Sequence, residues 1–234
     1  MAGAGEEMKS NLYEVDLESG EVKVRETPPR ALRAYLGGRG LNMYYLYRYL
    51  EPGTEPLAPE NVLIFGTGLL TGSGVPNSSR FNISAKSPES GILGDANCGG
   101  FFGPELRFAG VDRLVIKGRA ERPSYIYIED GRVEIRDARD YWGLNTVELQ
   151  RRLREDLGWD IQVAGIGEAG ERLVRFASVI NGIKNSASRG GMGAVMGAKR
   201  LKAVVARGSL GVPIRHPEEF VDTVRRIRDH LQSS

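Results

Sequence analysis

The sequence is nearly devoid of cysteine and histidine. Its 234 residues contain one cysteine, Cys98, and two histidines, His216 and His230. A single cysteine excludes a disulfide within the chain and any metal site built from several cysteines of this chain. Two histidines argue against a metal centre with several imidazole ligands. At this length a chain can bury most of its surface without a disulfide scaffold.

Strong net charge and long apolar segments are also lacking. Lysine and arginine number 32 against 30 acidic residues, so the net charge of +2 does not indicate a nucleic-acid partner. No apolar run approaches the ~18 residues of a membrane span. The first ten residues are polar and lack the hydrophobic region of a secretory signal. We therefore expect a cytoplasmic protein with no membrane partner.

Glycine, in contrast, is abundant, with 31 residues, roughly double the average usage of about 7%. Alternating apolar residues around turn residues predict two β-hairpins, at 12–24 and 124–136. Further strands are expected at 61–65, 80–85, 113–118, 161–164, 173–180 and 201–206, with a loop at 86–100. Helices are expected at 30–36, 41–50, 104–109, 146–157, 192–198 and 216–231. Asn145 and Glu148 have the spacing of a capping box.

Landmarks of one segment recur in the same order in a second segment. The first set is Gly66-Thr67-Gly68, Arg80-Phe81, Gly99-Gly100 and Gly118; the second is Gly165-Ile166-Gly167, Arg175-Phe176, Gly190-Gly191 and Gly208. The pattern predicts a duplicated β-rich unit, about 61–118 and 161–208, related by a pseudo-two-fold axis. Two Gly-Gly turns at helix N-termini would then face a shared centre and suit phosphate groups. Chance similarity and ordinary helix capping are the alternatives.

Residues 165–170 match the GxGxxG pattern of dinucleotide sites, but their context disagrees. The following segment, 172–180, has the pattern of a strand and not of a helix. The acidic residue expected about 20 positions further on is absent, since residues 184–186 are Lys-Asn-Ser. A nucleotide-binding enzyme is therefore the least favoured of three functional hypotheses.

Several polar residues in the glycine-rich loops are candidates for chemistry. Cys98 could be a nucleophile, but both histidines are remote in sequence, so a small buried residue near a ligand is favoured. Arg80 and Arg189 border the loops and could bind phosphate or simply be solvated. Asp95 and Asn97 could supply oxygen ligands to a cation such as Mg²⁺, although both residue types are common in loops.

Four segments carry a family resemblance: Gly37–Leu41, Gly68–Gly72, Ala96–Gly103 and Arg189–Lys199. They resemble, in order, the N-terminal domain of the tungsten-containing aldehyde:ferredoxin oxidoreductases, and the similarity covers about 12–208. The resemblance implies an α+β, β-rich fold of two pseudo-two-fold-related β-sheets with short helices. It also implies a bis-molybdopterin-binding base domain at 1–210, with 211–234 as the start of a truncated helical domain.

In that family the base holds a tungsten (or molybdenum) bis-molybdopterin and a Mg²⁺ that bridges the pterin phosphates. The resemblance implies Mg²⁺ binding through the backbone carbonyls of Asn97 and Ser186. Asn185 stands where the family often has a basic residue, and Lys184 beside it is a possible substitute. The cofactor-binding residues implied in total are Arg80, Asn97, Gly99, Gly100, Lys184, Asn185, Ser186, Arg189, Gly190 and Gly191.

Members of the family are longer, and their helical domains carry a [4Fe-4S] cluster and the proposed acid–base residues. The leading hypothesis is thus the cofactor-binding part of an enzyme that oxidises aldehydes to carboxylates with ferredoxin as acceptor. We expect no catalytic residue on this chain and no cluster, because Cys98 stands alone. The implied partners are the missing domains or a second subunit, with a homodimer also possible. The alternative is a stand-alone, non-catalytic pterin-binding or assembly module.

Overall fold

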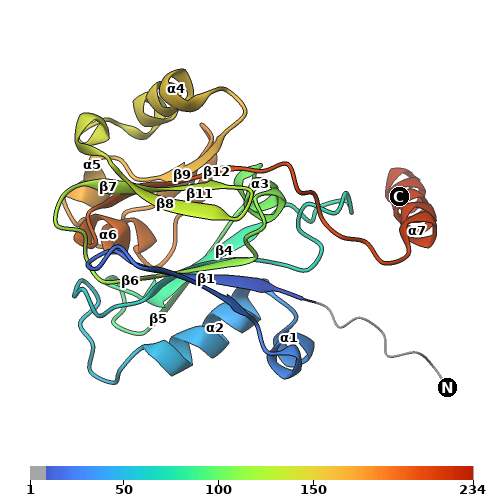
Figure 1. Cartoon of the computed structure of the whole chain (residues 1–234), viewed down its shortest axis with the longest axis horizontal. Coiled ribbons are helices and arrows are strands. Elements are labelled where there is room, and N and C mark those ends of the chain that lie inside the picture. The colour runs from blue at the N-terminus through green and yellow to red at the C-terminus, as the bar shows by residue number, and fades with distance from the viewer. Residues whose placement is uncertain (1–8, 234) are drawn as a thin grey trace.

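The computed structural model describes residues 9–233, and its body consists of two six-stranded sheets (Figure 1). Sheet one contains β1 (Asn11–Asp16), β2 (Val22–Glu26), β3 (Leu63–Thr67), β4 (Phe81–Lys86), β5 (Leu93–Cys98) and β6 (Arg113–Lys117). Sheet two contains β7 (Ser124–Glu129), β8 (Arg132–Asp137), β9 (Gln162–Gly165), β10 (Val179–Asn181), β11 (Asn185–Ala187) and β12 (Leu201–Arg207). Each sheet is built by one half of the described chain.

The two sheets have the same strand order. Sheet one runs β2-β1-β6-β3-β4-β5, and sheet two, in corresponding elements, runs β8-β7-β12-β9-β10-β11. In each sheet a single pair of strands is parallel, namely the first strand of the hairpin with the last strand of that half. These pairs are β1 with β6 and β7 with β12. The predicted fold class is confirmed, and the correspondence also includes both hairpins, which begin before residues 61 and 161.

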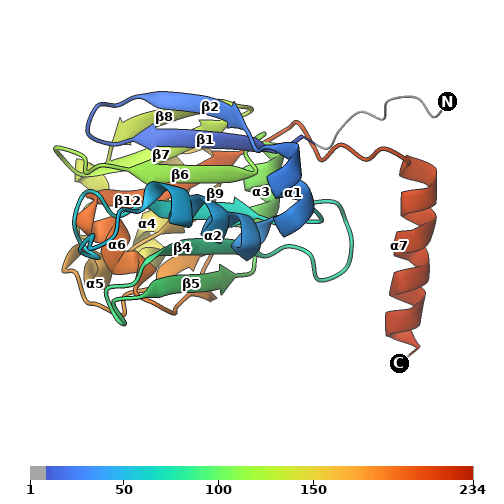
Figure 2. The same ribbon diagram turned by 90° about the horizontal axis from the view of Figure 1, so that it is seen from below.

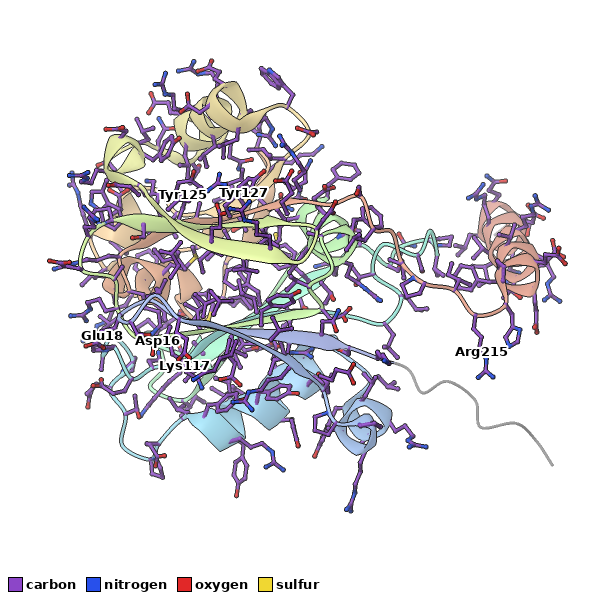
Figure 3. The ribbon with its side chains drawn as sticks, in the orientation of Figure 1. Asp16, Glu18, Lys117, Tyr125, Tyr127 and Arg215 are labelled. Atoms are coloured by element: carbon purple, nitrogen blue, oxygen red, sulfur yellow. The ribbon has the colours of Figure 1, made fainter. Side chains whose placement is uncertain are left out.

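Helices fill the remaining layers. The outer face of sheet one carries α1 (Pro29–Tyr35) and α2 (Gly38–Tyr49), and that of sheet two carries α4 (Thr146–Leu157) (Figure 1). Between the sheets lie α3 (Phe102–Phe108) and α6 (Met192–Ala198), whose apolar side chains share one core with the inner faces of both sheets. On the outer face of β7, Tyr125 and Tyr127 point toward α4 (Figure 3) and pack with Leu149 and Leu153. Two short helical turns, η1 (Arg139–Tyr141) and α5 (Glu168–Glu171), complete the body.

The last helix stands apart from the body. After residue 208 the chain leaves sheet two through a segment that contains Arg215 and then forms α7 (Pro217–Gln232) (Figures 1, 2 and 3). Of the helices in residues 9–233, α7 included, none has the length and apolar character needed to cross a bilayer. The domain boundary near 210 remains a prediction.

Two segments differ from the sequence-based expectation. The predicted loop 86–100 contains β5, and the predicted strand 173–180 is mostly turns, with β10 only at its end. Neither β11 nor α5 was predicted. The residues of β5 include Gly94, Asp95 and Asn97, which are poor strand formers; six paired positions with β4 hold them in the sheet.

A buried lysine connects the two halves of the chain. Lys199, at the end of α6, is 1% exposed. Its Nζ donates hydrogen bonds to the carbonyls of Pro59 and Gly118, each at 2.9 Å, and no described carboxylate bonds to it. Burial first, and then the positive charge of Arg119, lower the pKa of Lys199 to about 7.

This pKa predicts a pH-dependent stability. An unfolded lysine titrates near about 10.4, so between pH ~7 and ~10 the unfolded chain binds more protons than the folded chain. The unfolding free energy should therefore rise with pH across that window for the wild type relative to Lys199→Met. Urea titrations at several pH values measure it, with Lys23→Met, at an exposed residue of β2, as control. Parallel profiles for the wild type and Lys199→Met would contradict the assignment.

Candidate functional site

The open edges of the two sheets meet. At one end of the contact the Asn181 side-chain amide, from β10, donates to the Gly99 carbonyl at 2.9 Å. Gly100 follows with φ +86°, and a Cβ there would lie 2.6 Å from Asn181 Nδ2 and 2.7 Å from Asn185 Nδ2. Glycine is thus required at 100 both by the backbone angle and by the approach of the second sheet.

At the other end of the contact, the second half of the chain reaches the start of β5. A Cβ on Gly190 would lie 3.1 Å from Gly94 Cα. The Gly190 N–H also donates to Glu89 Oε2, at 3.0 Å, on the turn before β5. Residues 94–100 and 185–190 therefore run past each other in opposite directions. We call these two segments the seam.

Strand register identifies equivalent positions on the two sides of the seam. Gly66 and Gly165 are matching landmarks of the internal repeat. In sheet one the pairing leads from Gly66 across β4 to Asn97 on β5. In sheet two it leads from Gly165 across β10 to Ser186 on β11. Asn97 and Ser186 thus occupy corresponding places on facing edge strands, between the two contact points described above.

Unpaired positive charge flanks the seam. Arg80 directly precedes β4, while Lys184 and Arg189 lie on either side of β11, and all three are exposed. Within residues 9–233, no ion pair or hydrogen bond is made by these three side chains. The structure brings the sequence-predicted basic residues to one region and leaves them available to an anion.

A row of polar residues under α2 leads to the seam. Arg113 Nε donates to Asn42 Oδ1 at 2.8 Å, and Asn42 Nδ2 donates to Asn82 Oδ1 at 2.9 Å. Asn82 Nδ2 in turn donates to Asn97 Oδ1 at 3.2 Å and to the Asp95 carboxylate. No motif of the sequence predicted Asn42, Asn82, Arg113 and Asn181, because isolated polar residues in strands and helices carry no local pattern.

The predicted side-chain metal ligands have other partners. Asp95 Oδ2 pairs with Arg39 Nε at 2.5 Å, and Asn97 accepts from Asn82. Over residues 9–233, no group of three or more His, Cys, Asp or Glu side chains is placed to hold a metal. Within these residues, a cation at the seam would therefore lack a cluster of carboxylate, thiolate or imidazole ligands.

Cys98 is 1% exposed, on the core side of β5. Burial raises the pKa of its thiol to about 11, despite the opposing charge of Arg80. Both histidines lie in or beside α7, which stands away from β5 (Figures 1 and 2). This environment fits the expected small buried residue and gives no activated nucleophile.

The Gly190-Gly191 turn does not present a free helix N-terminus. Gly191 is buried with φ +70°, and its missing side chain leaves room for the Arg175 carbonyl. The Gly193 N–H of α6 donates to the Ala177 carbonyl at 2.9 Å. Packing therefore accounts for this turn, and the role of Gly190 and Gly191 in cofactor binding stays a prediction.

The GxGxxG segment has a packing explanation as well. The strand expected at 172–180 was wrong for most of its length, since that segment is mostly turns with β10 only at its end, and a short helix, α5, begins within the motif at Glu168. This helix has four residues, too short for the helix of a dinucleotide fold. A Cβ on Gly170 would lie 2.9 Å from the Gly193 carbonyl. The glycine thus lets α5 and α6 approach each other.

Comparisons with known proteins agree with this architecture. Residues 12–208 match the family profile described as aldehyde ferredoxin oxidoreductase, N-terminal domain. Two tungsten-containing aldehyde ferredoxin oxidoreductases, from Pyrococcus furiosus and Thermococcus kodakarensis, are each 45% identical over 220 residues, 94% of this chain. The chain belongs to the aldehyde ferredoxin oxidoreductase family. It spans 36% of the length of these two family members.

The family fold also appears in a solved structure. The active site complex BamBC of benzoyl coenzyme A reductase, with 1,5-dienoyl-CoA, matches with a TM-score of 0.93 and 39% identity, over 97% of this chain and 35% of that chain. An aliphatic sulfonate oxidoreductase, WOR-like subunit, of Pyrococcus furiosus is 38% identical over 92% of this chain. Proteins named for different substrates thus contain a domain similar to this chain.

A matched pair of glycine substitutions tests the seam. Gly74→Ala, at φ +87° in open space, should cost about 1 kcal/mol of unfolding free energy from backbone strain alone. Gly100→Ala, at φ +86°, should cost at least about 1 kcal/mol more, because its Cβ meets the amides of Asn181 and Asn185. Urea unfolding measures both variants. Equal losses would mean that the two sheet edges are not in contact at Gly100.

Proposed function

We propose that this chain is the cofactor-binding domain of a tungsten or molybdenum pterin oxidoreductase that oxidises aldehydes to carboxylates. The observation that carries the proposal is the equivalence of Asn97 and Ser186 on facing edge strands. Two matching strand edges suit a ligand with two matching halves, such as a metal held by two pterins. Membership of the family and the names of the longer relatives support the same assignment.

The residues at the seam fit the phosphate groups of such a ligand. Gly99 and Gly100 present backbone without side chains, and unpaired positive charge is available from Arg80, Lys184 and Arg189. In the proposed complex these three side chains bind the pterin phosphates, since charged donors form the stronger hydrogen bonds to oxyanions. Lys184 takes the place of the basic residue that the family often has at Asn185.

Mg²⁺ is assigned to the backbone carbonyls of Asn97 and Ser186. Hard cations take oxygen ligands, and Mg²⁺ is commonly bound by few protein groups together with phosphates. The asparagine row from Asn42 through Asn82 fixes the Asn97 side chain, so that its backbone is held in one orientation. Gly190 and Gly191 shape the far side of the seam.

When bound, the metallopterin supplies the two-electron chemistry, and the protein binds, orients and tunes it. Within this chain the proposed tasks are recognition of phosphate and placement of the cofactor. The matched region is only 36% of the length of the two tungsten-containing relatives. We assign the [4Fe-4S] cluster, the substrate channel and the contact with ferredoxin to protein segments or subunits other than this chain, and the proposed location is the cytoplasm.

Elemental analysis tests the proposal. The chain, produced anaerobically in a tungsten-replete host together with the remainder of its enzyme, should carry tungsten or molybdenum with magnesium. A charged hydrogen bond contributes about 1.5–3 kcal/mol, so Arg80→Gln should lower cofactor affinity by about tenfold or more. Arg151→Gln, on the outer surface of α4, should leave the metal content unchanged. Absence of both metals from folded wild-type protein would refute the proposal.

A further inference from the structure

One landmark of the sequence, the turn at Gly37–Gly40, has no part in the function proposed above. It forms the N-terminus of α2, a helix of 12 residues whose N-cap, Gly37, makes no side-chain hydrogen bond. The backbone N–H groups of Gly38, Arg39 and Gly40 have no hydrogen-bond partner within residues 9–233. The first turn of α2 also contains no acidic residue. This helix end is therefore an uncompensated positive pole.

The corresponding helix of the other half is satisfied. At the N-terminus of α4, Asn145 Oδ1 accepts from the N–H groups of Val147 and Glu148, each at 3.0 Å. The Glu148 side chain accepts in turn from the Asn145 N–H at 3.3 Å, completing a capping box. The equivalent helix N-termini thus differ: that of α4 is capped by side chains, and that of α2 is not.

A buried arginine lies against the first two turns of α2, where its guanidinium also lies 5.7 Å from the centre of the Tyr45 ring. Arg113 is 0% exposed, and its Nη2 donates to the carbonyl of Gly38, the first residue of α2, at 3.5 Å. Its Nε is bonded to Asn42, while Nη1 has no partner in the part of the chain that the structure describes. No described carboxylate hydrogen-bonds to this guanidinium. A full positive charge and a helix dipole therefore meet without an anion, an arrangement that costs free energy until an anion binds.

The uncapped N-terminus of α2 lies toward the end of β5 that leads into Gly99 and Gly100. A Cβ on Gly37 would lie 3.0 Å from the Thr67 carbonyl. Thr67 pairs with Phe81, and Phe81 pairs with Cys98. The N-terminus of α2, the start of β4 and the end of β5 therefore lie near one another. Arg39 adds a further charge on the surface, where it contacts Asp95.

We propose that the N-terminus of α2 is an oxyanion site for a phosphate group, formed by the Gly38, Arg39 and Gly40 amides above the Arg113 guanidinium. Backbone N–H groups at a helix start are suited to phosphate oxygens. The phosphate belongs either to the cofactor of the proposed function or to free phosphate. Only this choice of source depends on the proposed function.

Titration of the ¹⁵N-labelled chain with inorganic phosphate tests the site. The amide signals of Gly38, Arg39 and Gly40 should shift saturably, and those of Val147 and Glu148 should not. Arg39→Glu places a carboxylate in the first turn of α2 and should weaken phosphate binding by about tenfold. Arg48→Glu makes the same charge change at the other end of the helix and should leave binding within about twofold. Arg113→Met should abolish the shifts.

The outcomes distinguish two questions: whether phosphate binds at the N-terminus of α2, and which molecule supplies that phosphate. Failure of the three amides to shift, or equal weakening by Arg39→Glu and Arg48→Glu, would overturn the proposal. If the Arg113→Met variant does not fold, the comparison of Arg39→Glu with Arg48→Glu still tests whether phosphate binds at the N-terminus of α2. In cofactor-loaded protein, signals already shifted and insensitive to added phosphate assign the site to the cofactor, whereas an unchanged titration assigns it to free phosphate. A negative titration leaves the metal analysis above unaffected.

Discussion

The arrangement of this protein depends on two sheet edges that lie side by side. An edge strand carries unpaired N–H and C=O groups, which proteins ordinarily cover or block. Here β5 and β11 are both edge strands, and the segments around them pass side by side. Residues of the two edges are thereby brought close to one another. The short edge strands, the glycines at 99 and 100, and the hydrogen bond from Asn181 to the Gly99 carbonyl all favour that approach.

A second constraint lies under α2. A side chain at Gly66 would collide with Asn42, so the glycine lets the asparagine reach the sheet. Asn42 then connects the buried Arg113 to Asn82 and so to the strand edge. Buried polar networks of this kind specify one arrangement when their members are satisfied. The position of the seam is thus fixed from within the domain as well as across it.

Sequence patterns predicted the elements whose local signals are strong. Both hairpins, the helix at 146–157 and its cap at Asn145 were predicted and are confirmed. The short edge strands were not predictable, because Asp95, Asn97 and Asn185 have low strand propensity and are held in the sheets by pairing with β4 and β10. The start of α2 at Gly38 was missed because helix propensity disfavours the glycines at 38 and 40, which nevertheless lie in its first turn. The motifs of the seam were recognised, whereas its supporting residues carried no local signal.

The two halves share one topology but differ in the buried charge beside their equivalent helices. In a dimer of identical subunits both sides of a two-fold site must change together. A duplicated unit within one chain is free of that restriction. One half keeps an uncapped helix above Arg113, while the other closes its helix with Asn145. The domain therefore carries an asymmetric distribution of charge on a nearly symmetric scaffold, and a symmetric ligand of the kind proposed above would meet a different field at each of its two ends.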